Sequence, residues 1–172
     1  SEALPLQTHI LSSLGVLAGM RGNRDESLAY FQTAINIAED IQYRWMIPLL
    51  KNNLGTLHCL HNEHRLGRRY FEEALQMRTE AGIQPLIGHL LNNLGEAASE
   101  NQDYDEAIQR FNEAIPIYQK LGTRTGLMNA LNGLGRVHLE LRQFPMTEKY
   151  LRQSLQIGRQ SKSLPQILQA LM

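Results

Sequence analysis

The sequence predicts an all-α protein built from four copies of one helical hairpin. Leu-Gly pairs recur every forty residues, at Leu14-Gly15, Leu54-Gly55, Leu94-Gly95 and Leu134-Gly135. Within each copy, apolar residues recur at intervals of three and four, which is the helical period, and a short polar break separates two such stretches. A spacing kept along the whole chain indicates one structural unit that is repeated and stacks on its neighbours.

Each copy is expected to contain a first and a second helix. We expect first helices over residues 4–20, 45–61, 85–100 and 124–141. We expect second helices over residues 24–39, 64–80, 104–120 and 144–160. The repeats then span about 4–43, 44–83, 84–123 and 124–163. Residues 164–172 align with the start of a fifth repeat, so we expect residues 1–172 to form one array that is a fragment of a longer protein.

Local signals predict helix ends and irregularities. Asp103 is placed to cap a second helix, and Glu106 three residues later is placed to complete a capping box. Gly122 is placed as a left-handed C-cap. Pro48 predicts a late start for its helix, whereas Pro116, which removes a backbone hydrogen bond, predicts a kink or early fraying.

The repeated glycines predict close packing inside each hairpin. A glycine within a helix costs up to about 1 kcal/mol relative to alanine, so its repetition needs a packing reason. Twelve residues after each glycine comes a position that favours close approach of the second helix, occupied by Ser27, Gly67, Ala107 and Thr147. Bulky residues that follow are expected to fill the space toward the next repeat, namely Phe31, Phe71 and Phe111.

The charges balance overall but are sorted by repeat. Lysine plus arginine number 17 and aspartate plus glutamate number 17, so no global field favours nucleic acid or a membrane surface. The net charges of residues 1–40, 41–80, 81–120 and 121–160 are −3, +2, −4 and +4. The single cysteine, Cys59, excludes an internal disulfide framework. With no apolar run approaching a membrane span and no signal-peptide pattern, we expect a soluble, cytoplasmic protein.

No motif for catalysis or cofactor binding stands out. A phosphate-binding loop, a nucleophile elbow and a metalloprotease motif are all absent from the sequence. His58, His61 and His64 with Cys59 resemble metal ligands, but a structural zinc site usually takes two separated pairs of ligands. We therefore favour His58 as a space-filling residue, together with His138 in the fourth repeat. We predict no enzymatic activity, no cofactor and no metal.

One basic cluster is expected to face outward. Arg65, Arg68 and Arg69 follow one another closely on an expected second helix. This spacing places them on an outer helix face, where contact with solvent or with the rim of a partner is favoured over nucleic acid.

The pattern resembles the tetratricopeptide repeat (TPR). It shares the Leu-Gly pair, a small residue twelve positions on, an aromatic residue four beyond and a small residue three further. The period of forty rather than about thirty-four resembles the long variants of kinesin light chains and of bacterial regulator sensor arrays. The resemblance implies a right-handed α-solenoid in which the first helices line a concave groove that binds peptides or partner proteins.

Transferring the groove positions of the family defines a candidate peptide site. An Asn amide both donates and accepts, so a row of asparagines can hold the backbone of an extended peptide whatever its sequence. The alternative is that these amides satisfy neighbouring helix ends or bind water. The candidate groove residues are Asn52, Asn92, Asn132, His89, Asn129, Glu96, Arg136, Glu100 and Glu140.

Three functions are compatible with this pattern. The favoured one is a scaffold that binds a protein or peptide ligand bearing basic side chains, because the second half of the groove is mostly acidic. The second is a signal-sensing or oligomerisation domain of a multidomain transcription regulator, binding a small molecule or a signal peptide. The third is an array attached to an enzyme. Apolar residues in 164–172 also predict self-association through the ends of the array.

Overall fold

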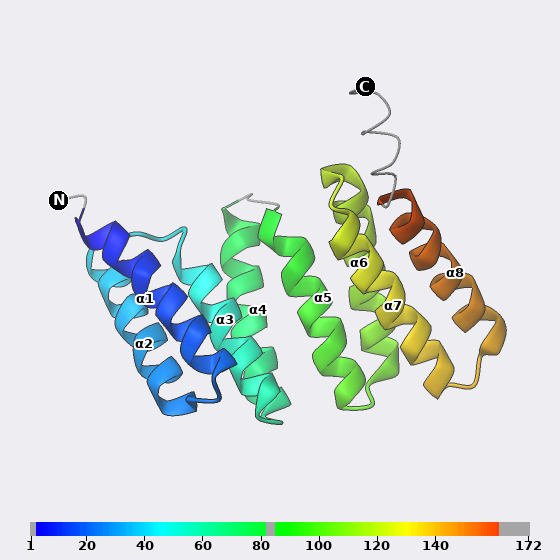
Figure 1. Ribbon diagram of the computed structural model, residues 1–172, viewed down its shortest axis with the longest axis horizontal. Coiled ribbons are helices and arrows are strands. Elements are labelled where there is room, and N and C mark those ends of the chain that lie inside the picture. Colours follow the sequence, from blue (N-terminus) through cyan, green and yellow to red (C-terminus); the bar gives the residue numbers. More distant parts are fainter. Residues whose placement is uncertain (1–2, 82–84, 162–172) are drawn as a thin grey trace, which may run out of the picture. The chain divides into compact units, whose positions relative to one another are not determined.

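A computed structural model describes residues 3–81 and 85–161, and within these ranges all regular secondary structure is helical (Figure 1). The eight helices are α1 (Ala3–Met20), α2 (Arg24–Asp40), α3 (Ile47–Leu60), α4 (His64–Glu80), α5 (Pro85–Glu100), α6 (Tyr104–Leu121), α7 (Arg124–Glu140) and α8 (Phe144–Ser161). The segment 164–172, predicted to begin a fifth repeat, lies outside the described residues.

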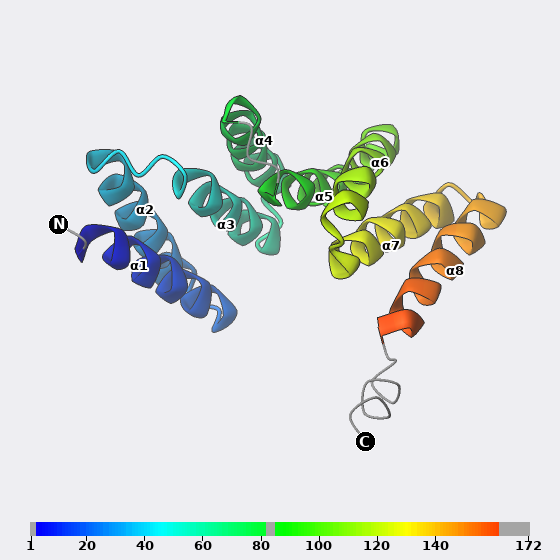
Figure 2. The same ribbon diagram turned by 90° about the horizontal axis from the view of Figure 1, so that it is seen from above.

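The helices fall into two compact units, Ser1–Leu86 and Ile87–Met172, and each unit is described by itself. The first unit holds the hairpins α1–α2 and α3–α4, and the second holds α5–α6 and α7–α8 apart from the first two residues of α5 (Figure 2). Every predicted helix is present with its ends within two residues of the expected positions. The late start predicted from Pro48 is confirmed, since α3 begins at Ile47 and a proline is tolerated in the first turn.

The turns of the four hairpins each have one residue in the left-handed backbone conformation. Gly22, Asn62, Gln102 and Arg142, spaced forty residues apart, all have φ between 56° and 80°. Glycine adopts this left-handed conformation freely, whereas Gln102 and Arg142 adopt it at a cost of roughly 1–2 kcal/mol. The overall geometry of the hairpin therefore imposes the turn conformation even where the local residue disfavours it.

Two predicted helix ends have different outcomes. Gly122 is the C-cap of α6 with φ 66°, as predicted. Asp103 is the N-cap of α6, but its side chain makes no capping hydrogen bond, so the predicted capping box is wrong. The Asp103 N–H, which the box would pair with the Glu106 side chain, donates instead to the Ala98 carbonyl at 2.9 Å.

Pro116 does not shorten its helix. α6 continues for five residues beyond Pro116 to Leu121, so the prediction of early fraying is wrong. The last turn of α6 carries Tyr118, which is 2% exposed and packs against Gly126 of α7. Burial of this ring stabilises the turn that the missing backbone hydrogen bond would otherwise leave weak.

The glycines of the Leu-Gly pairs lie where the two helices of a hairpin approach most closely. In the first hairpin, Ser27 Oγ donates to the Gly15 carbonyl at 2.7 Å. In the second, a Cβ built on Gly55 would lie 2.9 Å from the Gly67 carbonyl oxygen. The predicted packing role of these glycines is confirmed, because a side chain at either position has no space.

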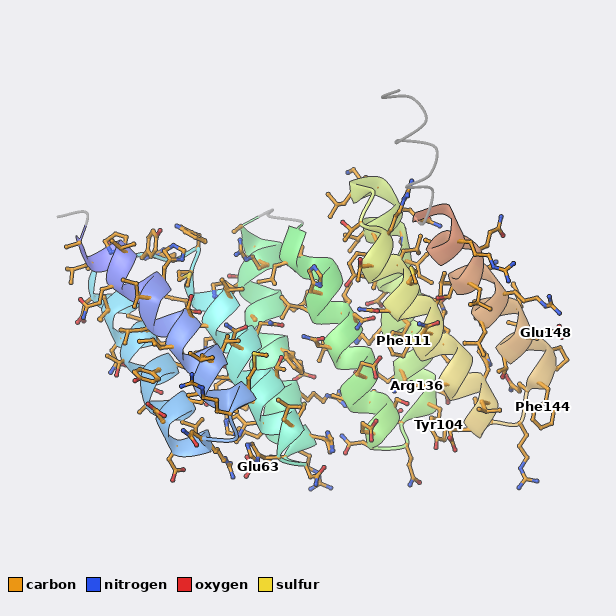
Figure 3. All side chains as sticks on the ribbon, in the orientation of Figure 1. Glu63, Tyr104, Phe111, Arg136, Phe144 and Glu148 are labelled. Carbon is orange, nitrogen blue, oxygen red and sulfur yellow. The ribbon has the colours of Figure 1, made fainter. Side chains whose placement is uncertain are left out.

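The bulky residue of each repeat packs over the same glycine. A Cβ on Gly15 would lie 2.6 Å from the Phe31 ring, and a Cβ on Gly95 would lie 2.8 Å from the Phe111 ring. Phe111 is labelled in Figure 3. Its ring also lies against Gly133 of the following hairpin. It therefore joins its own hairpin to the next one, as predicted.

Stacking of one hairpin on the next builds the core of the first unit. The buried face of α2 contributes Phe31, Ala34, Ile35 and Ala38. The N-cap of α3, Met46, and its buried face contribute the other side of the core, which includes Ile47, Leu50, Leu54 and Leu57. The second helix of one repeat thus packs against the first helix of the next repeat.

Helix α1 corrects one expectation from composition. It spans 18 residues with a mean hydropathy of 1.2, so its length and composition would allow it to cross a membrane, whereas the sequence was expected to contain no such segment. A mostly buried core helix and a signal sequence near the N-terminus pass the same test, and 22% of α1 is buried. In the structure α1 packs on α2, where Ser27 Oγ donates to the Gly15 carbonyl.

Replacing Gly95 by leucine tests the helix contact directly. Leucine is the better helix former, so on an open face Gly95→Leu would be neutral or stabilising. Here the Phe111 ring lies between Gly95 and Gly133 and has no room to move, so we expect overpacking of roughly 1–3 kcal/mol. Thermal unfolding followed by circular dichroism should show a melting temperature lower by several degrees.

The matched control is Asn112→Leu, an exposed position on α6. It should leave the melting temperature nearly unchanged. Equal melting temperatures for Gly95→Leu, the control and the wild type would contradict the assignment of the repeats.

Candidate functional site

Eight of the nine candidate groove residues lie on α5 and α7, which are the two first helices of the second unit. Their spacing of three and four residues places each set along one stripe of its helix. On α5 these residues are His89, Asn92, Glu96 and Glu100. On α7 they are Asn129, Asn132, Arg136 and Glu140. We call these two stripes the α5/α7 face; Asn52 lies on α3 in the first unit.

Asn92 differs from the other candidate asparagines in its burial. Its side chain is 9% exposed, and its Oδ1 has no hydrogen-bond partner within the part of the chain that the structure describes. A buried acceptor without a partner costs about 1–3 kcal/mol. Asn132, its counterpart on α7, is exposed, so the two amides are not equivalent as the repeat pattern suggested.

Glu96 and Arg136 form an ion pair across the α5/α7 face. Arg136 Nη2 donates to Glu96 Oε2, joining residues that are forty positions apart in the sequence (Figure 3). Both side chains are partly exposed, so the pair contributes little to stability. It neutralises one of the predicted acids, which leaves Glu100 and Glu140 as the exposed carboxylates of this face.

His89 contacts a residue that the sequence did not single out. Its Nδ1 lies 3.5 Å from the hydroxyl of Tyr118, and the two rings meet edge to face with centroids 5.5 Å apart. Burial raises the pKa of Tyr118 to about 12, so the phenol stays neutral and can act as a donor. Gly88 and Gly126 make room for the Tyr118 ring. These two glycines are the feature of the sequence from which close packing of the ring could have been predicted.

The corresponding positions of the first unit carry no Asp, Glu, Lys or Arg. Asn52 is half-buried there, and its Nδ2 lies 3.5 Å from Asn53 Oδ1. A pocket of about 210 Å³ opens between α1 and α3. The exposed residues that line it are Val16, Thr56, Met20 and Leu60. At the equivalent positions, eighty residues later, the second unit has Glu96, Arg136, Glu100 and Glu140. The two units therefore present different chemistry at equivalent positions.

His58 and His138 stand three residues after Gly55 and Gly135, where the repeat family that the sequence resembles usually carries an aromatic residue. Both histidines fill that space, as predicted. His58 and His138 are each 6% exposed and stack on Tyr70 and Tyr150, with ring centroids 5.3 Å apart in both cases. Within the described residues, no three His, Cys, Asp or Glu side chains gather as a metal site. The cysteine beside His58 is therefore not joined to a ligand cluster there.

Glu63 links the first two repeats through His58 and Arg24. His58 Nδ1 lies 2.6 Å from Glu63 Oε2, and Arg24 Nη2 lies 2.6 Å from both carboxylate oxygens. The hydrogen bond with His58, and then that from Arg24, holds the pKa of Glu63 below its ordinary value. The fourth repeat carries the neutral counterpart, His138 with Gln143 at 2.6 Å.

The basic cluster on α4 is partly neutralised. Arg68 Nε lies 2.8 Å from Glu72, and Arg69 Nε lies 3.0 Å from Glu73, each pair one helical turn apart. Arg65 is exposed on the same helix. The cluster is therefore interleaved with carboxylates along α4.

Comparison with known proteins identifies the family. One tetratricopeptide-repeat model matches residues 46–120 and 86–160, and a second matches residues 8–41. The chain belongs to the tetratricopeptide-repeat family. TPR hairpins in general form non-catalytic scaffolds for protein interaction, so the broad function of this TPR chain is interaction with other proteins. No curated protein sequence matches the chain.

Several bacterial proteins of known structure share the TPR fold of this chain. BtubC (BKLC) from P. vanneervenii has a TM-score of 0.81 at 22% identity, over 92% of this chain and 65% of its own. Aspartyl phosphate phosphatase F from Bacillus subtilis has a TM-score of 0.84 at 16% identity, over 91% and 41%. Pseudomonas aeruginosa pilF has a TM-score of 0.75 at 21% identity, over 91% and 64%.

These identities show the fold alone. They confirm the predicted class, an all-α solenoid of TPR hairpins. The chain spans less than two thirds of the length of each of these proteins.

The lowered pKa of Glu63 predicts a pH-dependent contribution to stability. A carboxyl group whose pKa is lower in the folded than in the unfolded state stabilises the fold above its unfolded pKa, and this contribution is lost as the pH falls through the folded value. Glu63→Gln, which copies the His138–Gln143 pair, should therefore lower the melting temperature at pH 7. The difference from wild type should shrink as the pH is lowered below about 4.

The control is Glu39→Gln, an exposed carboxyl group on α2. It should show the wild-type pH profile. A Glu63→Gln variant that is as stable as wild type at pH 7, or a deficit that does not depend on pH, would contradict the assigned role.

Proposed function

We propose that this TPR chain is a non-enzymatic scaffold that binds an extended peptide segment on the α5/α7 face. The observation that carries the proposal is the buried Oδ1 of Asn92, an acceptor with no partner among the described residues. A peptide N–H reaching this atom would satisfy it, and the Asn92 amide group can donate to a peptide carbonyl in return. Asn132 offers a second amide on the neighbouring helix.

Charge on the same face favours a basic ligand. Glu100 and Glu140 end α5 and α7 as exposed carboxylates, while Glu96 is already paired with Arg136. A Lys or Arg side chain near this end of the two helices would gain modest attraction that raises the association rate and weakens with salt. Ordering of the ligand on an open, polar face keeps the affinity modest.

A second function, a sensor domain that binds a small molecule or signal peptide within a larger regulator, is favoured by one observation. A pocket of about 440 Å³ lies on α6, α7 and α8, away from the candidate groove residues. Pockets of this size hold small molecules in other proteins. The pocket is compatible with the scaffold function, because the two sites use different residues.

The test for the scaffold is the double variant Asn92→Ala/Asn132→Ala. Peptides selected from a random library on the wild type should bind the variant about tenfold or more weakly, as measured by calorimetric titration. Stability should not fall, because Asn92→Ala removes an acceptor that is already unsatisfied in the free protein. Loss of binding without loss of stability is the signature of a ligand-binding amide.

The matched control is Asn112→Ala, an exposed asparagine of α6. It should bind like the wild type. Equal affinity of the folded double variant and the wild type would move the peptide site off the α5/α7 face.

A further inference from the structure

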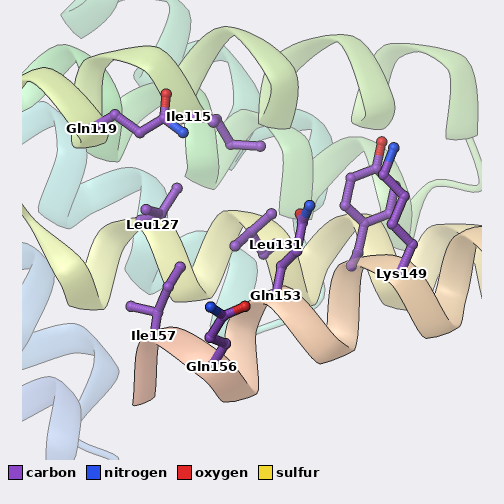
Figure 4. A pocket seen from close by; sticks show the side chains of 9 residues that line it. Ile115, Gln119, Leu127, Leu131, Lys149, Gln153, Gln156 and Ile157 are labelled. Carbon is purple, nitrogen blue, oxygen red and sulfur yellow. The ribbon is translucent and has the colours of Figure 1, made fainter. Parts of the chain in front are cut away.

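A pocket on the second unit combines an apolar floor with a polar rim (Figure 4). It has a volume of about 440 Å³ and lies between α6 and α8 over α7. The apolar part is formed by Ile115, Leu127, Leu131 and Ile157. The polar part is formed by Gln119, Lys149, Gln153 and Gln156. Three amides and one ammonium group therefore surround an apolar space.

The corresponding place in the first unit, eighty residues earlier, is occupied by an ion pair. Lys51 stands where the second unit has Leu131, and Glu73 stands where it has Gln153. Lys51 Nζ lies 2.6 Å from Glu73 Oε2 and 5.9 Å from the centre of the Tyr70 ring. The pair thus occupies two of the positions whose counterparts line the pocket in the second unit. At these positions the first unit has an ion pair, whereas the second has an apolar side chain and an amide.

Differences at the lining positions also change the charge of the site. Glu39 and Glu73 of the first unit are replaced by Gln119 and Gln153 in the second, so both acids are lost. Of the two cations at this place in the first unit, Lys51 is replaced by Leu131, and Arg69 is kept as Lys149. Arg69 pairs with Glu73 at 3.0 Å, and loss of this acid removes the equivalent partner of Lys149.

The surroundings of Lys149 also favour an anion. Its ammonium group lies 5.4 Å above the Tyr150 ring, and within the described ranges it forms no ion pair. Residues 121–160 contain six basic and two acidic side chains. One of the two acids, Glu148, already pairs with Arg152 at 2.6 Å. A negatively charged ligand group would therefore meet a basic helix with little competition.

We propose that this pocket binds a small carboxylate with an apolar body. The carboxylate pairs with Lys149 and accepts hydrogen bonds from the glutamine amides, and the apolar body packs on Leu127, Leu131 and Ile157. A peptide C-terminus with an apolar last residue and an alkyl carboxylate share this chemistry. The pocket shares no residue with the α5/α7 face, so its test is independent of the scaffold proposal.

Three matched probes test the chemistry on the wild-type chain: N-acetyl-leucine, its uncharged analogue N-acetyl-leucinamide, and octanoate. Amide chemical-shift changes in two-dimensional NMR spectra should locate binding of at least one acid to α6, α7 and α8. Dissociation constants on the order of 0.1–1 mM are expected for ligands of this size. The leucinamide should bind at least tenfold more weakly than N-acetyl-leucine. The tighter of the two acids identifies a peptide C-terminus or an alkyl chain as the preferred source.

Two variants test the residues. Leu131→Lys/Gln153→Glu copies the Lys51–Glu73 pair of the first unit and should abolish binding while the chain stays folded. The reverse exchange, Lys51→Leu/Glu73→Gln, is the control and should leave the site on α6–α8 unchanged. Lys149→Gln changes an exposed side chain and should weaken binding of the acid at least tenfold. This variant tests the site whether or not the double variant folds.

Each result decides the proposal. No binding of either acid, shifts outside α6–α8, or wild-type affinity of the bound acid after Lys149→Gln would overturn it. Detectable binding of N-acetyl-leucine that its amide equals would also overturn it. Wild-type affinity in a folded Leu131→Lys/Gln153→Glu variant would do the same. The Asn92→Ala/Asn132→Ala variant should bind the acid normally, which separates this site from the peptide site.

Discussion

Close approach of the two helices within each hairpin is the contact on which the rest of the structure depends. It is possible because a glycine follows the leucine of each repeat, and the backbone of the second helix then comes within hydrogen-bonding reach. Ser27 Oγ bonds the Gly15 carbonyl at 2.7 Å, and in the second hairpin Gly67 meets Gly55 with no side chain between them. The phenylalanine four residues after this small residue of the second helix packs over the same glycine. Phe111 also packs over Gly133 of the next hairpin. Helix rotation is thereby fixed, and with it the set of residues that face outward.

A fixed rotation makes equivalent positions comparable between the units, and their differences carry the chemistry. Where the first unit has Val16 and Thr56, the second has Glu96 paired with Arg136. On another face, the Lys51–Glu73 ion pair is replaced by Leu131 and Gln153, and a pocket opens. The repeated residues thus fix the packing of the helices. The variable positions give the first unit an uncharged first-helix face and the second unit a charged one. This division follows from stacking, because residues that pack between hairpins cannot vary as freely as those that face solvent.

Much of the fold could be predicted from the sequence because its signals are local and repeated. Periodicity located the helices, Pro48 indicated the late start of α3, and the space left by a missing aromatic residue predicted the roles of His58 and His138. The misses depend on distant partners. α6 continues through Pro116 because Tyr118 is buried against α7, and Glu96 is neutralised by an arginine forty residues away. The burial of Asn92 is likewise not revealed by any pattern within one helix. The pocket over Leu131 is lined by side chains of three helices, so no single-helix pattern reveals it either.

The central claim is that the α5/α7 face binds the peptide backbone through Asn92. The most direct measurement follows the side-chain amide resonance of Asn92 in a nitrogen-15-labelled chain while a library-selected peptide is titrated to saturation. The account predicts a large shift of this resonance, slowed exchange of its amide protons, and backbone shifts concentrated on α5 and α7. An unchanged Asn92 resonance in the saturated complex, with backbone shifts on the second helices instead, would contradict it.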